Sequence, residues 1–101
     1  MNLSDLTQTM HTFVQSMGWY DPNSPRPQTM RNLAISLSLE ASEVMEHFQW
    51  DEVLKDSTEL SDELADVLLY LMQLASIAGI DLEKAVLAKL EKNYQRKWDS
   101  G

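Results

Sequence analysis

Four stretches of this chain carry apolar residues at the three- and four-residue spacing of a helix face. No stretch of useful length alternates apolar and polar residues as a half-buried strand does. Strong breaking signals separate the four stretches: Gly18 ends the first, a loop from Trp19 to Gln28 with all three prolines precedes the second, and Gly79 ends the third. We therefore predict an all-α fold with four helices.

The helix starts and the packing can also be predicted. Ser4, Asp56 and Asp81 are each expected to cap a helix, because a short polar side chain can accept a hydrogen bond from a free first-turn N–H. The second helix is predicted over about residues 29–50. This helix and the third are the long apolar ones, so we expect them to form a central antiparallel pair that a second protomer completes into a four-helix bundle.

Length and charge limit the function classes. A chain of 101 residues fits a single domain, 1–101. The net charge of −8 argues against binding to a nucleic-acid polymer, since no basic stripe is available to neutralise phosphates. The absence of cysteine excludes disulfides and thiolate metal sites. No apolar run is long enough to span a bilayer, so we expect a cytoplasmic protein that does not bind membranes.

Two acidic pairs interrupt the apolar faces of the two central helices. Glu40 and Glu43 have the form E-x-x-E, and Glu63 and Asp66 the form E-x-x-D. Residues three apart project from the same side of a helix, so four carboxylates would border the contact between the helices. One such pair is ordinarily a solvated surface feature. Two pairs on adjacent apolar helices favour a bound cation, since the charges would otherwise repel.

The ligand types indicate which cation is expected. With carboxylates alone, and with neither cysteine nor an E-x-x-H motif, Mg²⁺ is favoured over zinc or a di-iron centre, and Mn²⁺ is a possible substitute. Mg²⁺ held by carboxylates typically also binds substrate phosphates, which points to phosphate chemistry. The pattern does not determine the number of ions or the carboxylate that serves as general base.

The segments around the acids resemble a known family. Residues 39–50 read LEASEVMEHFQW and residues 62–71 read DELADVLLYL. Together with the Lys89-x-x-x-Asn93 segment, they resemble the MazG-type nucleotide pyrophosphohydrolases, an all-α superfamily marked by E-x-x-E followed by E-x-x-D. The resemblance covers roughly residues 28–98, and it is strongest to the short, single-domain branch that includes dCTP pyrophosphatases.

The resemblance implies a Mg²⁺-dependent enzyme that hydrolyses a (deoxy)nucleoside triphosphate to the monophosphate and pyrophosphate. It implies a house-cleaning role in the dNTP pool and a homodimer or dimer of dimers. It assigns metal binding and catalysis to the four acids, Glu40, Glu43, Glu63 and Asp66. The residues it implies for nucleotide binding are Trp19, Trp50, Tyr70, Lys89, Asn93 and Arg96.

Other interpretations of the same residues stay open. The chain could be a non-catalytic helical dimerisation or regulatory module whose acidic face binds a basic partner, or a metal-binding bundle without catalysis. The three aromatic residues can equally be packing residues, and the basic residues near residue 96 can be a solvated helix end. His11 and His47 are expected to be surface or core residues rather than ligands. Aromatic stacking tolerates every base, so the preferred base is not predicted.

Overall fold

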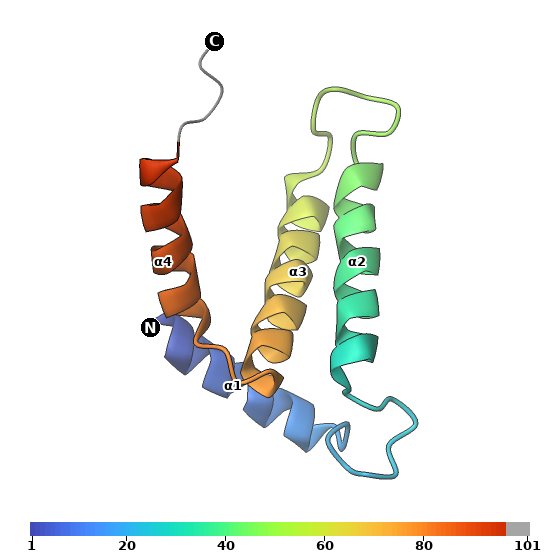
Figure 1. Ribbon diagram of the computed structural model, residues 1–101. Helices are drawn as coiled ribbons and strands as arrows, with labels where there is room; N and C mark the ends of the chain where they lie inside the picture. Colours follow the sequence, from blue (N-terminus) through green and yellow to red (C-terminus); the bar gives the residue numbers. More distant parts are fainter. Residues whose placement is uncertain (97–101) are drawn as a thin grey trace.

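The computed structural model describes residues 1–96 and is entirely helical over that range. Its four helices are α1 (Leu3–Ser16), α2 (Met30–Glu46), α3 (Ser57–Ile77) and α4 (Leu82–Gln95) (Figure 1). The predicted fold class of four helices without strands is confirmed for this part of the chain. The last five residues of the predicted domain, 97–101, lie outside the described residues.

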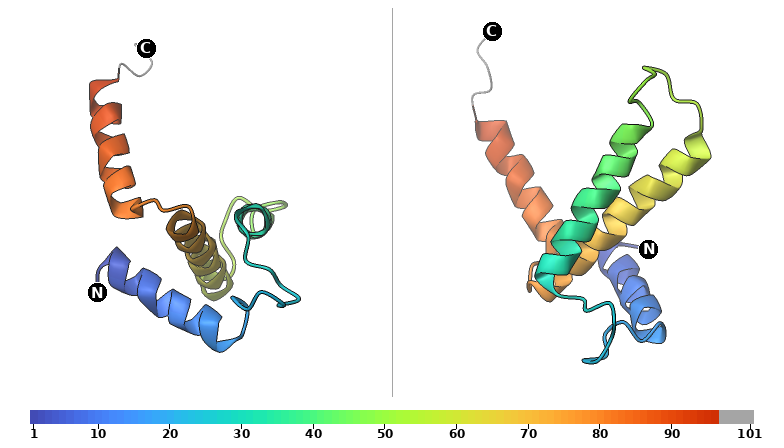
Figure 2. Two further views of the ribbon diagram at one scale, coloured as in Figure 1. Left: turned by 60° about the horizontal axis from the view of Figure 1, so that its bottom comes forward. Right: turned by 90° about the vertical axis from the view of Figure 1, so that its right-hand side faces the viewer.

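The helices α2 and α3 form the central antiparallel pair, and α1 lies across the C-terminal end of α3 (Figures 1 and 2). Met10 and Val14 of α1 are buried against Met72 of α3, and this cluster is the main core. Leu33 of α2 is also almost fully buried. The helix α4 diverges from α3 beyond their connecting turn, so it borders the pair only at one end.

Short polar side chains start the helices. Asp56 and Asp81 cap α3 and α4 as predicted, and each accepts a first-turn backbone N–H, at 3.0 and 3.1 Å. The prediction of Ser4 as the cap of α1 is wrong. Asn2 takes this position and its Oδ1 accepts the N–H of Asp5 at 2.8 Å. Asn caps a helix as well as Ser does, so the helix begins earlier and Ser4 lies inside its first turn.

Glycine ends α1 and α3 as predicted. Gly18 and Gly79 both have φ of +74°, in the left-handed region where glycine carries no steric penalty. After Gly18 the chain turns back, and the N–H of Trp19 donates to the carbonyl of Val14 at 3.3 Å. This turn packs Trp19 against the core cluster, so the end of α1 determines where the tryptophan lies.

The helix α2 ends at Glu46 and not near Trp50 as predicted. His47, Phe48 and Gln49 each donate their N–H to the carbonyl three residues earlier, at 3.3, 3.0 and 3.3 Å. Hydrogen bonds that span three residues instead of four tighten the last turn, so the chain leaves the α-helical path. Trp50 consequently lies beyond the helix with 86% of its surface exposed.

A single chain leaves long apolar faces uncovered. The exposed aliphatic residues of α2, α3 and α4 include Ile35, Leu39, Leu64, Leu68, Val86, Leu87 and Leu90. No residue of α4 is buried. Within residues 1–96, no helix is by itself long and apolar enough to cross a membrane; α3 and α4 meet those criteria only jointly, and they are bent by 100° at the break between them.

Candidate functional site

The two acidic pairs lie at the seam between α2 and α3. The pKa of the Glu40 carboxyl is raised above its ordinary value, first because burial removes water from it, then because of a side-chain hydrogen bond with Glu43 and the negative charge of Glu43, and last because of the charges of Asp66 and Glu63. Asp66 and Glu63 belong to α3, so the charges that act on Glu40 come from both helices of the pair. The structure therefore brings together the four acids that the sequence patterns identified.

The seam has the chemistry that a hard divalent cation requires. The Oε2 atom of Glu40 is buried and accepts no hydrogen bond. A buried anionic oxygen without a partner is costly, and a cation in the seam would satisfy it. The other donors are also carboxylate oxygens, so the residues fit Mg²⁺. Among the described residues, no three acidic or histidine side chains already converge on one point in the arrangement that a metal ion needs.

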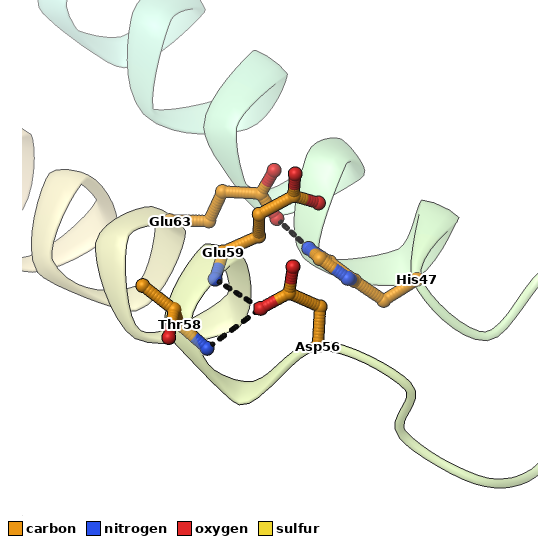
Figure 3. A network of polar contacts seen from close by, with 5 residues as sticks. All are labelled: His47, Asp56, Thr58, Glu59 and Glu63. Carbon is orange, nitrogen blue, oxygen red and sulfur yellow. Dashed lines mark hydrogen bonds and ion pairs between the residues drawn. The ribbon is translucent and has the colours of Figure 1, made fainter.

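His47 is part of this seam, which the sequence analysis missed. Its Nε2–H donates to Oε2 of Glu63 (Figure 3). The two side chains are largely buried, with 12% and 24% of their surface exposed. The only signal in the sequence was the spacing from Glu43 to His47, four residues, which puts the imidazole one turn further along the same helix face.

A cavity of about 740 Å³ adjoins the acidic seam. Residues of α1, α2, α3 and the proline-containing loop line it. Asp66 lines it on the side of the seam, and both Tyr70 and Trp19 contribute aromatic surface. Phe13 packs edge-on against Trp19, with ring centroids 5.7 Å apart. One cavity therefore joins a carboxylate of the seam to two of the aromatic residues expected to bind a nucleotide.

Residues of the proline-containing loop form one wall of this cavity. The guanidinium of Arg26 lies over the ring of Trp19, 5.8 Å from its centroid. The Nε2 of Gln73, a buried residue of α3, donates to Oε1 of Gln28 at 2.7 Å, and Nε2 of Gln28 donates to the carbonyl of Arg26 at 2.7 Å. These bonds fasten the loop to α3. Arg26 could not be identified from the sequence, because an irregular loop has no periodicity that reveals which side chains face inward.

The remaining candidate residues do not line the cavity. Trp50 lies in the turn after α2, and the other three, Lys89, Asn93 and Arg96, belong to or follow α4. Because α4 diverges from the central pair, its residues are not gathered around the seam within one chain (Figure 2). The structure thus brings six of the ten candidate residues together, namely Glu40, Glu43, Glu63, Asp66, Trp19 and Tyr70.

Comparisons with known proteins add an independent line of evidence. A profile of the MazG-like family matches residues 35–100. The dCTP pyrophosphatase 1 of Rattus norvegicus is 33% identical over 103 aligned positions, and that of Homo sapiens is 32% identical. Both alignments cover 93% of this chain, which spans 58% of the length of these relatives. A crystal structure of a pyrophosphatase from Archaeoglobus fulgidus has a TM-score of 0.72 and 34% identity, covering 91% of this chain and 88% of the other.

Proposed function

Because this chain belongs to the MazG-like family, we propose that it hydrolyses a deoxynucleoside triphosphate to the monophosphate and pyrophosphate. The observation that carries the proposal is the cavity shared by Asp66 and Trp19. A nucleotide has an anionic end and an aromatic end. The cavity offers the second aromatic surface, and a cation held by the acidic seam would offer the first a positive charge. The relatives named dCTP pyrophosphatase 1 support the substrate class.

The proposed reaction assigns a role to each part of the site. Glu40, Glu43, Glu63 and Asp66 would hold Mg²⁺, or Mn²⁺ in its place. When bound, the cation supplies positive charge that offsets the charge of the phosphate oxygens. Water adds to the α-phosphorus, one of its protons passes to a carboxylate oxygen of the seam, and the bond to the oxygen bridging to the β-phosphate breaks. Pyrophosphate then leaves with that oxygen.

A panel of canonical and modified dNTPs, incubated with the protein and Mg²⁺, tests the proposal directly. Release of pyrophosphate and the monophosphate is expected, and a chelator should stop it. Higher kcat/KM for modified than for canonical nucleotides would support a house-cleaning role. Release of orthophosphate and a diphosphate would contradict the proposed reaction, and absence of turnover would favour the non-catalytic module.

We expect the active form to contain at least two copies of the chain, a homodimer or a dimer of dimers. The exposed apolar faces of α2, α3 and α4 need a partner to remove them from water. A second copy could also bring the α4 residues Lys89 and Asn93 to an acidic seam. Light scattering coupled to gel filtration should give a mass of two or four chains. A monomeric mass at assay concentration, with full activity, would contradict this expectation.

Arg26 should strengthen nucleotide binding, because it contributes positive charge to the wall of the cavity. A hydrogen bond to a charged group typically contributes about 1.5–3 kcal/mol of binding free energy. Because Met cannot donate such a bond, Arg26→Met should raise the KM for the preferred dNTP about tenfold, with a smaller effect on kcat. Arg31→Met is the matched control, since Arg31 is exposed and lies outside the cavity lining. Equal KM values for the two variants would show that Arg26 does not contribute to nucleotide binding.

A further inference from the structure

His47 occupies one end of the acidic seam. It is the C-cap residue of α2 and follows Glu43 by one turn. On the antiparallel α3, Glu63 lies opposite His47, and Asp66 follows Glu63 by three residues. The imidazole therefore reaches across the helix interface to Glu63, the member of the E-x-x-D pair nearer the start of α3 (Figure 3).

The contact uses only one of the two carboxylate oxygens of Glu63. Nε2 of His47 donates to Oε2, and a carboxylate can only accept, so the ring carries its proton on Nε2. Figure 3 shows Oε1 directed away from the imidazole. Burial of both side chains keeps water from competing strongly for the bond. Glu63 is thereby held in one rotamer with one oxygen left for another partner.

We propose that His47 is a positioning residue for the cation of the seam, acting through Glu63. This inference rests on the proposed function, because it presupposes that Glu63 is a metal ligand. A glutamate has several rotatable bonds, and holding it in place before the cation arrives removes a cost of ordering it at binding. The backbone of His47 keeps α-helical dihedral angles, so its imidazole continues the helix face that carries Glu43.

Direct ligation of the cation by His47 fits the structure less well. The Nε2 atom is already engaged by Glu63. Mg²⁺ prefers oxygen ligands, whereas an imidazole nitrogen suits Mn²⁺ and the later transition metals better. A positioning role predicts that loss of His47 weakens Mg²⁺ and Mn²⁺ binding by similar factors, while direct ligation predicts a loss concentrated on Mn²⁺.

The test is a titration of the nucleotide-free protein with Mg²⁺ and, separately, with Mn²⁺, followed by thermal unfolding and by calorimetry. His47→Leu removes the hydrogen-bond donor and fills its space with an apolar side chain. It should lower the affinity for both cations by roughly 10- to 100-fold. His47→Gln can present an amide N–H to Glu63 and should restore most of the affinity. His11→Leu is the matched control, because His11 contacts Ser76 on another face of α3, at 2.7 Å, and should leave both titrations unchanged.

The outcomes separate this inference from the proposed function. If the wild-type protein shows no stabilisation by either cation, the proposed metal site itself fails. If the wild type binds and His47→Leu binds equally well or more tightly, the site stands and the positioning role is refuted. A loss confined to Mn²⁺ would also refute it, in favour of direct ligation. If His47→Leu fails to fold, His47→Asn replaces it in the test. Asn is too short to place an amide where Nε2 lies, so the same loss of affinity for both cations is expected.

Discussion

Replacing Asp66 with Asn should lower the kcat of dNTP hydrolysis by about 10³-fold or more, with helix content unchanged. Asp66 is the acid of the seam that also lines the cavity, so its charge lies where the cation and the phosphates meet. Asn has the same shape but carries no charge, and Asp66 is exposed, so the packing of α3 does not depend on it. Steady-state assays with pyrophosphate detection, together with circular dichroism, measure both quantities.

A neighbouring acid provides the control for this experiment. Asp62 lies on the same helix, is also exposed, and is not one of the four acids of the seam. Asp62→Asn should retain activity close to that of the wild type. Glu43→Gln, which alters the other helix, should reproduce the defect of Asp66→Asn. Near-normal turnover by both Glu43→Gln and Asp66→Asn would show that the seam is not the catalytic centre.

Replacing Glu40 with Gln should have opposite effects on stability and on metal binding. In the metal-free native protein the pKa of Glu40 is raised, so the folded state holds this proton more tightly than the unfolded state does. The resulting stabilisation is present below the ordinary carboxyl pKa of 4.5 and is lost as the pH rises through the raised pKa. At pH 7, above the ordinary carboxyl pKa, the burial and crowding of Glu40 therefore lower the stability of the fold, and Glu40→Gln should raise the melting temperature by roughly 2–5 °C.

The same variant should lose most of its stabilisation by Mg²⁺, because the buried Oε2 is no longer anionic. Melting curves in chelator at pH 7 and at pH 4, and then with added Mg²⁺, separate the two effects. The gain in melting temperature should shrink at pH 4, below the ordinary carboxyl pKa of 4.5, because the carboxyl of Glu40 is then mostly protonated in the unfolded state as well. Glu46→Gln, at an exposed position of the same helix, should change neither quantity. A melting temperature of Glu40→Gln below that of the wild type at both pH values would contradict the expected repulsion between the four acids.

The helices were predictable because their signals are local. Periodic apolar residues mark the faces, while Asp56, Asp81, Gly18 and Gly79 mark the boundaries through hydrogen bonds and dihedral preferences that involve only neighbouring residues. The gathering of the four acids was also predictable, since antiparallel packing of two apolar faces brings their polar borders together.

The features that could not be predicted depend on contacts between distant residues. The early end of α2 coincides with the contact between His47 and Glu63, sixteen residues apart. The position of Arg26 depends on bonds from Gln28 and Gln73 that connect the loop to α3. The helix α4 diverges after the turn that follows α3, and the apolar patterns of these two helices do not determine the direction of that turn.

The fastening of the loop to α3 has a consequence for the kinetics of association. Three prolines limit the conformations of the free loop, and the bond between Gln28 and Gln73 selects one of them during folding. The entropic penalty of ordering this wall thus falls on folding rather than on ligand capture. A ligand meets a preformed surface, so its association rate should depend on diffusion and charge more than on rearrangement of the loop.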